Sequence, residues 1–446
     1  MEDIFTSEEL EATARETGFY RRESKVKPSV FFDLLMYDIS SGNSKSLNQL
    51  SIEARSEHDI GVTKQGIDKK FNERTLGFLK SLIEKQLSVE LDLQIDAGWL
   101  SSFNRVTIKD GTRFNLPEEY KDYLPGSGGS GSKAGACLQF EFDLKSGHVT
   151  DLDITASNRP DVKDALESLD NVKKGDLVIR DLGYYAFKSF SNILEKDAFF
   201  ISRLGAKTNV FEMKSGNHKK VDFKTIYHKM KRRQLSRIYK DVFIGTKEKI
   251  PVRLVIELMP DDVYEQRMRK ISKLHKKKGY QTSEQYKFLA RFNLFITNVT
   301  EEVLPNHVIS SLYRMRWQIE LIFKIWKSVF GIHHTRKMKY QRWLCLLHFK
   351  LLMMIVNWNI IMAQRNYLYR WKGKLLSLNK CFKTLFDNIY RLREALRLGQ
   401  IWVKKFVEWT ARILNENHWL ERKKNKAGLE KIFYIMFCKS NIYVYI

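Results

Sequence analysis

The chain has 446 residues, of which 43% are hydrophobic and 13% aromatic. This composition excludes a broadly disordered protein and allows about two to four structural units with buried cores. Lysine and arginine total 77 against 52 aspartates and glutamates, which gives a formal net charge of +25 at pH 7. That excess favours a polyanionic partner, because each phosphate neutralised by a lysine or arginine releases condensed counterions. A merely basic soluble protein is the alternative that charge alone leaves open.

The cysteines and the apolar stretches bear on the compartment. The four cysteines have no short paired spacing, which argues against a zinc ribbon or a disulfide scaffold and fits a reducing compartment. The first residues, MEDIFTSEELEATARETGF, are acidic and polar, unlike a secretory signal peptide. The most apolar stretch, 346–361, is interrupted by His348, Lys350 and Asn357 and falls short of the ~20 apolar residues of a membrane-spanning helix. We therefore predict a buried helix there and a soluble, cytoplasmic protein without a membrane partner.

Residues 1–95 lack strand alternation and are predicted to be helical. The predicted helices are 5–19, 29–39 and the stretch from Lys45 to Leu91, with turns at 40–46 and 56–66. The second turn is compatible with a helix-turn-helix, in which Lys64, Lys69 and Lys70 would reach phosphates. A purely structural helical bundle explains the same pattern.

From about residue 96 the pattern changes to that of strands. Four segments alternate or run apolar with β-branched and aromatic residues: 105–110, 136–143, 148–157 and 176–181. The stretch 124–135 is rich in Gly and Ser and is predicted to be a mobile loop. It lacks the Gly-Lys-Ser/Thr ending of a nucleotide-binding P-loop. With a helix at 161–169, these segments predict a mixed α/β sheet.

Residues 206 to about 290 are predicted to form a β-rich insertion with a basic face. Its strand-like pieces are 209–214, 241–246 and 252–260. Basic turns such as HKKVDFKTIYHKMKRRQ separate them, and MRKISKLHKKKGY adds a lysine run. A strand pattern returns at 292–299, and the chain is predicted to be helical from Leu304 onward.

Two aspartates close predicted strands of the sheet. Asp110 ends RVTIKD and precedes Gly111, while Asp181 ends DLVIRD and precedes Leu182-Gly183. Carboxylates at neighbouring strand ends, followed by a chain-reversing glycine, present oxygen ligands to a hard cation. Taken singly, such an aspartate is more often a turn former or a helix cap.

The segment 311–332, SLYRMRWQIELIFKIWKSVFGI, is predicted to be one helix. Five polar residues spaced by three or four form a stripe along it: Tyr313, Arg316, Glu320, Lys324 and Lys327. Apolar residues occupy its other faces and can bury it: Leu312, Trp317, Ile319, Ile322, Phe323 and Trp326. A solvent-facing salt-bridge stripe is the common alternative. A helix this apolar elsewhere leaves little room for an idle charged stripe, so we expect Glu320 to hold a metal ion and its cationic neighbours to hold phosphates.

The pattern Tyr313-x2-Arg316-x3-Glu320-x6-Lys327 resembles the Tyr-Arg-Glu-Lys (YREK) signature of bacterial insertion-sequence transposases of the DDE type. This group is named after insertion sequence number four and includes the transposase of transposon five. KDGTRFNLP around Asp110, the loop PGSGGSGSKAG and VIRDLGYY around Asp181 also resemble that family. The resemblance spans roughly residues 100–335 and, more weakly, the helical N-terminus.

The resemblance implies a ribonuclease H-like catalytic core in which Asp110, Asp181 and Glu320 are the catalytic, metal-binding triad. It implies DNA contacts for the cations and the tyrosine of the stripe, namely Tyr313, Arg316 and Lys327, with Lys324 matching a lysine of some members. With the patterns above, it divides the chain into a helical N-terminal DNA-binding domain (1–95), a core in two parts (96–205 and 292–365), the β-rich basic insertion domain (206–291) and a helical C-terminal region (366–446).

The implied cofactor is Mg²⁺, for which Mn²⁺ can substitute. Two such ions, ~3.5–4 Å apart, activate a water or a 3′-hydroxyl and stabilise the leaving oxygen in an in-line displacement. Mg²⁺ keeps several waters and needs few protein carboxylates, so three suffice.

The function implied is cleavage and strand transfer at the ends of an insertion sequence, by cut-and-paste DNA transposition in the bacterial cytoplasm, at the nucleoid. The partners implied are double-stranded DNA at the terminal inverted repeats, the target DNA and a second copy of the chain in the synaptic complex. Two alternatives remain open: a metal-dependent nuclease on the same fold, and a catalytically silent DNA-binding derivative of a transposase. No small-molecule substrate is expected.

Overall fold

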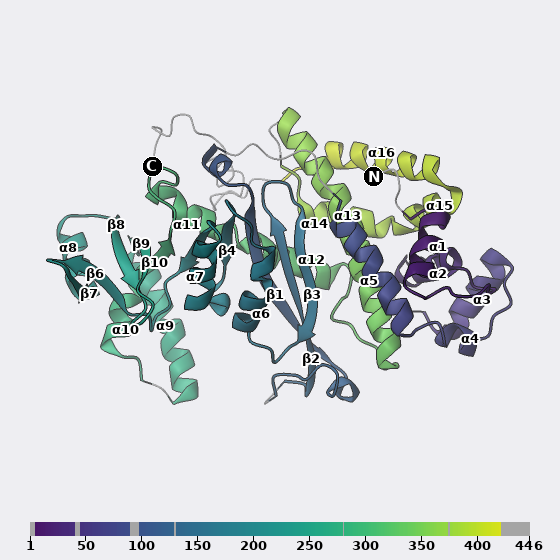
Figure 1. Ribbon diagram of the computed structural model, residues 1–446, viewed down its shortest axis with the longest axis horizontal. Coiled ribbons are helices and arrows are strands. Elements are labelled where there is room, and N and C mark those ends of the chain that lie inside the picture. The colour runs from purple at the N-terminus through teal and green to yellow at the C-terminus, as the bar shows by residue number, and fades with distance from the viewer. Residues whose placement is uncertain are drawn as a thin grey trace.

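A mixed sheet of ten strands runs through the computed structural model, which describes residues 5–40, 45–89, 98–128, 131–279, 281–372 and 375–420 (Figure 1). The strands are β1 (Val106–Leu116), β2 (Ala134–Asp143), β3 (Val149–Ala156), β4 (Leu177–Arg180), β5 (Phe199–Arg203), β6 (Val210–Lys214), β7 (Asn217–Lys220), β8 (Arg237–Ile244), β9 (Ile250–Leu258) and β10 (Phe292–Thr297). Every predicted strand is present, so the prediction of a mixed α/β sheet is confirmed.

The order of the strands is β3-β2-β1-β4-β5-β10-β9-β8-β6-β7. The first three strands pair antiparallel, whereas β4 runs parallel to both β1 and β5. β10 pairs antiparallel with β5 on one side and with β9 on the other. The strands of the segment 206–291 are therefore hydrogen-bonded into the same sheet as the strands that precede them.

The basic stretch 218–234 was predicted to be a turn, and this prediction is wrong. It contains the end of β7 and a helix, α8 (Phe223–Arg232). Asp222 caps α8 by accepting a hydrogen bond from the Lys224 backbone, and Ile226 and Met230 are buried one turn apart. This apolar stripe lies among lysines and is easily overlooked. The lysine run lies in α9 (Asp261–Lys278), and α10 (Glu284–Leu289) follows.

The described part of residues 1–95 is helical, as predicted. Its helices are α1 (Ser7–Glu16), α2 (Pro28–Ser40), α3 (Leu47–His58), α4 (Lys64–Asp68) and α5 (Glu73–Leu87). Local caps set their starts. Ser46 and Gln49 form a capping box at α3, and Asn72 accepts two backbone hydrogen bonds at α5. Both predicted turns lie between helices. Residues 41–44 of the first turn lie outside the described residues, as do residues 129–130 of the predicted Gly- and Ser-rich loop at 124–135.

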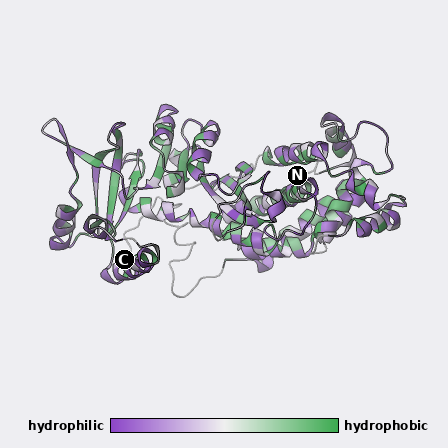
Figure 2. Cartoon of the chain, turned by 90° about the horizontal axis from the view of Figure 1, so that it is seen from below, coloured by the Kyte–Doolittle hydropathy of each residue, from purple (hydrophilic) through white to green (hydrophobic). Residues whose placement is uncertain are grey.

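The other helices of the described residues are α6 (Asp161–Glu167), α7 (Phe187–Glu195), α11 (Asn306–Arg314), α12 (Trp317–Ser328), α13 (Tyr340–Lys372), α14 (Leu378–Asp387), α15 (Ile389–Leu398) and α16 (Gln400–Asn417). Short 3-10 turns lie at η1 (Gly98–Ser102), η2 (Glu118–Tyr120), η3 (Ser168–Asn171) and η4 (Leu182–Tyr184). The outer faces of the helices are mostly hydrophilic (Figure 2).

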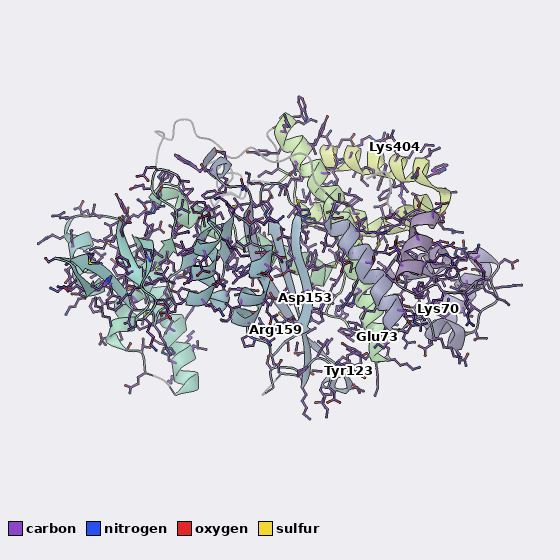
Figure 3. The ribbon with its side chains drawn as sticks, in the orientation of Figure 1. Lys70, Glu73, Tyr123, Asp153, Arg159 and Lys404 are labelled. Atoms are coloured by element: carbon purple, nitrogen blue, oxygen red, sulfur yellow. The ribbon has the colours of Figure 1, made fainter. Side chains whose placement is uncertain are left out.

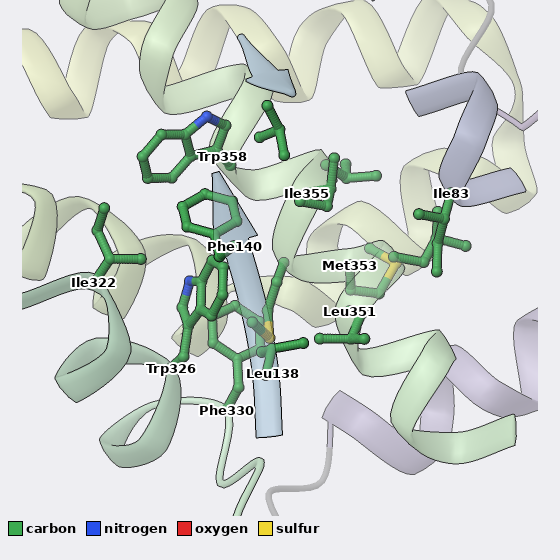
Figure 4. Packing of buried hydrophobic residues seen from close by; sticks show 14 of the residues in the cluster. Ile83, Leu138, Phe140, Ile322, Trp326, Phe330, Leu351, Met353, Ile355 and Trp358 are labelled. Carbon is green, nitrogen blue, oxygen red and sulfur yellow. The ribbon is translucent and has the colours of Figure 1, made fainter. Parts of the chain in front are cut away.

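The main core lies where α12 and α13 cover β2. The ring of Phe140 lies 4.7 Å from that of Trp326 and 5.5 Å from that of Trp358 (Figure 4). α13 is long and apolar enough to cross a membrane, but 94% of its most apolar window is buried inside the protein. The buried helix predicted at 346–361 is thus confirmed. Its apolar residues are buried because the helix lies between the sheet and α5.

A buried ion cluster joins the N-terminal helices to α15. Arg393 donates hydrogen bonds to both Oδ atoms of Asp33, at 2.8 and 2.6 Å, and to Oε1 of Glu53 at 2.7 Å. Nε2 of His58 lies 2.8 Å from Oδ2 of Asp33. Burial alone raises the pKa of Asp33, but Arg393 and His58 outweigh it, and the net pKa is lowered. The cluster ties together segments more than 300 residues apart.

We expect Arg393→Met to lower the free energy of unfolding by about 3–5 kcal/mol at pH 7, because Asp33 and Glu53 would stay buried without their cation. Denaturant unfolding measures this loss. Arg397→Met is the matched control, since Arg397 pairs with the more exposed Glu57, and its loss should be about 0–1 kcal/mol. Equal losses in the two variants would contradict the assignment.

Candidate active site

Asp110 lies within β1, so the prediction that it ends a strand is wrong. β2 pairs with β1 from Thr107 to Leu116 and keeps the backbone extended past Asp110. The pairing with β4, however, stops at Lys109↔Arg180. Asp110 therefore lies level with the carboxyl end of β4. From this residue onward β1 is no longer paired with β4, whereas its pairing with β2 continues.

Gly111 does not reverse the chain, since it lies inside β1. Its role is steric. A Cβ atom there would lie 2.9 Å from Oε1 of Gln139 and 3.0 Å from Sγ of Cys137. The same Gln139 oxygen accepts a hydrogen bond from Tyr184 at 2.5 Å, so glycine leaves room for this buried contact.

Asp181 follows β4 directly, as predicted. Its backbone is extended, with φ −76° and ψ 169°, and it begins the short turn η4. Oδ1 of Asp181 accepts a hydrogen bond from Oη of Tyr313 at 3.1 Å. Tyr313 thus contacts one of the predicted carboxylates in this structure.

The single helix predicted at 311–332 is divided into α11 and α12 at Met315–Arg316. Here the backbone N–H of Arg316 bonds to the Tyr313 carbonyl, and that of Ile319 to the Arg316 carbonyl, both at 3.1 Å. These three-residue bonds tighten the turn without reversing the chain. Trp317, at the start of α12, is 57% exposed rather than buried.

The guanidinium of Arg316 lies between three carboxylates. Its Nη1 is 2.7 Å from Oδ2 of Asp110, and its Nη2 is 3.0 Å from Oε1 of Glu320. Its Nε is 3.8 Å from Oδ1 of Asp181 and has no hydrogen-bond partner. Arg316 is 7% exposed. The structure therefore brings Asp110, Asp181 and Glu320 together around one buried cation. The sequence analysis did not predict that this cation, Arg316, would lie between them.

Burial and neighbouring charges set the protonation of this cluster. Burial, together with the negative charges of Asp181 and Glu320, raises the pKa of Asp110 to about 6, although Arg316 opposes the rise. Burial alone lowers the pKa of Arg316, but the surrounding carboxylates outweigh it and raise the net pKa. Burial and the adjacent Asp181 raise the pKa of Tyr313. The cluster thus places three carboxyl groups around one guanidinium.

The donor set fits a hard divalent cation, because carboxylate oxygens are its preferred ligands and the cluster carries excess negative charge. Among the described residues, no group of three or more His, Cys, Asp or Glu side chains is spaced to hold a metal ion as it stands. The reason lies in Arg316, whose guanidinium occupies the space between the carboxylates.

The two lysines of the predicted stripe lie differently. Nζ of Lys327 donates to the Arg113 carbonyl at 3.1 Å, beside β1, and burial lowers its pKa. Lys324 is exposed and lines an apolar cavity between α12, α13 and α14. At ~100° per residue, Lys324 and Lys327 are only about 60° apart around the helix, and Lys324 lies on the side of the cavity. Only Lys327 lies beside the strand that carries Asp110.

Sequence analysis missed two charged residues beneath the site. Lys109 and Arg180 directly precede the two aspartates, and both are buried. The available signal was a basic residue at a buried position of an otherwise apolar strand, where an unpaired charge is costly.

The family described as Transposase DDE domain matches residues 101–356, which contain all three carboxylates. Along nearly its whole length the chain is similar to the transposase for insertion sequence element IS231F of Bacillus thuringiensis subsp. israelensis, with 30% identity over 98% of this chain and 94% of the relative. The transposase for IS231B of subsp. berliner is 28% identical over 96% of this chain and 92% of the relative. The transposase for IS1151 of Clostridium perfringens is 25% identical over 92% and 89%.

The raised pKa of Asp110 predicts a stability gain on removing its charge. Such a carboxyl stabilises the fold most below its unfolded pKa of ~3.9, and this contribution falls as the pH rises to about 6. We expect Asp110→Asn to raise the free energy of unfolding at pH 7.5 by about 1–3 kcal/mol, with a smaller gain near pH 4.

Denaturant unfolding with a metal chelator present measures this gain. Asp33→Asn serves as the control and should be destabilising, because the pKa of Asp33 is lowered in the folded protein. An Asp110→Asn variant that is less stable than the wild type at pH 7.5 would contradict the prediction.

Proposed function

The chain belongs to the family of DNA-processing transposases described as Transposase DDE domain, which matches residues 101–356 of the 446. We propose that Asp110, Asp181 and Glu320 form its catalytic, metal-binding triad. The protein is an insertion-sequence transposase, an enzyme of DNA transposition whose family uses divalent metal ions. The observation that carries the triad is the convergence of three carboxylates from β1, the end of β4 and α12 on one guanidinium.

The proposed metal is Mg²⁺, with Mn²⁺ as a substitute. When bound, it would activate the attacking oxygen and stabilise the leaving oxygen of the scissile phosphate. Asp110, Asp181 and Glu320 would hold it and must be ionised to do so. Arg316 must then give up part of its contact with the carboxylates, which frees guanidinium donors for a DNA phosphate.

Tyr313, Arg316 and Lys327 are proposed to position DNA phosphates near the transposon end. All three lie within hydrogen-bonding distance of the triad or of the strand that carries Asp110. Lys324 is proposed as a further DNA contact at the edge of the same helix. Phosphate contacts of this kind fix the orientation of the duplex without reading its sequence.

The finer fold assignment is also proposed. A ribonuclease H-like core would comprise 96–205 and 292–365, with the insertion domain at 206–291, the DNA-binding domain at 1–95 and the C-terminal region at 366–446. The mixed sheet formed by strands β1 to β5 supports this core, because Asp110 and Asp181 lie where β1 runs parallel to β4. The YREK stripe supports membership of the group named after insertion sequence number four.

Cut-and-paste transposition in the bacterial cytoplasm, at the nucleoid, is the proposed reaction. The partners would be the terminal inverted repeats, the target DNA and a second protomer in the synaptic complex. The relatives are named as transposases for insertion sequence elements, which supports DNA ends as the substrate. A nuclease that cleaves without joining, or a silent DNA-binding derivative, stays the alternative.

We expect Glu320→Gln to reduce cleavage and strand transfer by at least ~100-fold with Mg²⁺, while binding to a labelled transposon-end duplex changes little. The amide keeps the shape of the side chain but loses the charge that a metal ion requires. Glu408→Gln, on the exposed face of α16, is the matched control and should behave as the wild type.

The same assay separates the alternatives. Cleavage without joining by the wild type would favour the nuclease, and binding without cleavage would favour the silent derivative. Normal cleavage by Glu320→Gln would reject the triad.

The two lysines give a second test. We expect Lys327→Met to weaken binding of the transposon end and to reduce by about one the number of counterions released, read from the salt dependence of the dissociation constant. Lys324→Met should weaken binding less, because Lys324 lies beside the cavity next to α14. Equal loss of binding in both variants would contradict this expectation.

A further inference from the structure

Four charged residues form a row across four neighbouring strands of the sheet. In the register of the strands, Asp151 of β3 pairs with Glu141 of β2, Glu141 with Lys109 of β1, and Lys109 with Arg180 of β4. The row begins at Asp151 on β3, the edge strand, two residues before Asp153, which is labelled in Figure 3. Because side chains alternate along a strand, this row lies on the face opposite to Asp110.

The basic members of the row are held by short contacts. Nζ of Lys109 lies 2.5 Å from Oδ2 of Asp151 and 2.8 Å from Oδ2 of Asp164, which α6 supplies. Nη2 of Arg180 lies 3.2 Å from Oε1 of Glu141, and Nη1 donates to the Ala165 carbonyl at 3.1 Å.

Three of the four residues in the row are buried, and Asp151 on the edge strand is partly exposed. Lys109 is 0% exposed, Glu141 1% and Arg180 6%. Ion pairs at such depth contribute little net stability, because desolvation offsets their attraction, and apolar residues of equal size often stabilise a fold as well or better. What a buried pair does supply is a penalty against other arrangements, since any shift leaves a charge unpaired.

The arrangement that the row enforces is the register of β1 against β4. A slip of one residue in either strand would move the cation of that strand, Lys109 or Arg180, to the opposite face of the sheet and away from its carboxylates. The next residue on each strand is a proposed metal ligand, Asp110 on β1 and Asp181 after β4. Their distance apart therefore follows from the pairing of Lys109 with Arg180.

We propose that Lys109 and Arg180 are positioning residues for the reaction: with Glu141, Asp151 and Asp164 they lock the register of β1 and β4, so that Asp110 and Asp181 face one metal site. This inference rests on the proposed triad. α6 takes part because its Asp164 side chain and Ala165 carbonyl hold the two cations from beneath the sheet.

The test compares two charge-neutralised clusters. The first variant is Lys109→Met/Asp151→Asn/Asp164→Asn, which removes the charges while keeping the side-chain sizes close. The control is Arg393→Met/Asp33→Asn/Glu53→Gln, which does the same to the buried cluster that joins α2, α3 and α15. Each is measured for its thermal midpoint, for Mn²⁺ affinity by electron paramagnetic resonance without DNA, and for cleavage of a transposon-end duplex.

We expect the first variant to stay folded, to bind Mn²⁺ about 10- to 100-fold more weakly than the wild type, and to lose cleavage in proportion. The control should keep its Mn²⁺ affinity within about twofold, whatever its thermal midpoint. A first variant that folds and binds Mn²⁺ as the wild type does would overturn the positioning role. If it does not fold, Glu141→Gln, which removes only the partner of Arg180, carries the same expectation and the same refutation.

Asp110→Asn distinguishes this failure from that of the triad. If Asp110→Asn keeps the wild-type Mn²⁺ affinity, the proposed triad is wrong and the positioning role is rejected with it. If Asp110→Asn loses affinity while the first variant does not, the triad stands and only the positioning role is rejected.

Discussion

The parallel pairing of β1 with β4 is the constraint on which the site depends. It ends at Lys109 and Arg180, so the two residues that follow, Asp110 and Asp181, lie side by side with no further strand pairing between them. On one side of β1 the antiparallel partner β2 continues and keeps the backbone straight. An aspartate in the middle of one strand can thus share a site with an aspartate at the end of another. The backbone hydrogen bonds of the sheet supply this placement, in the register that the buried row of Lys109 and Arg180 is proposed to fix.

The third carboxylate comes from a helix, and the break between α11 and α12 determines how it meets the sheet. The tightened turn at Arg316 places the guanidinium over Asp110 and Asp181 while Glu320, one turn later, stays within 3.0 Å of the same group. Arg316 neutralises part of a cluster that otherwise holds three like charges in a poorly solvated position. Burial, with the smaller effect of Asp181 and Glu320, still raises the pKa of Asp110 against the opposing effect of Arg316. A cluster of buried like charges that suits a cation is for the same reason a local weakness of the fold.

The two faces of the sheet have different chemistry. On the side of α12 and α13, Phe140, Trp326 and Trp358 form an apolar core that contributes stability through burial (Figure 4). On the side of α6, Lys109 and Arg180 meet carboxylates that add little net stability but restrict the register. The apolar face of the sheet therefore contributes stability, and the charged face restricts the register of the strands.

The sequence by itself determined the strands and the helices of the described N-terminal and C-terminal parts, because hydrophobic periodicity and cap residues act over a few neighbouring positions. It also identified the stripe from Tyr313 to Lys327, since helical spacing is a local property. It failed at Asp110, because β1 continues past this residue where β2, a separate segment, pairs with it. It also missed α8, because the few apolar residues of this helix lie among many lysines. Only the tertiary structure decided that Arg316 would also meet Asp110, and that Lys109 and Arg180 would share a buried row, because these contacts join residues 206, 42 and 39 positions apart.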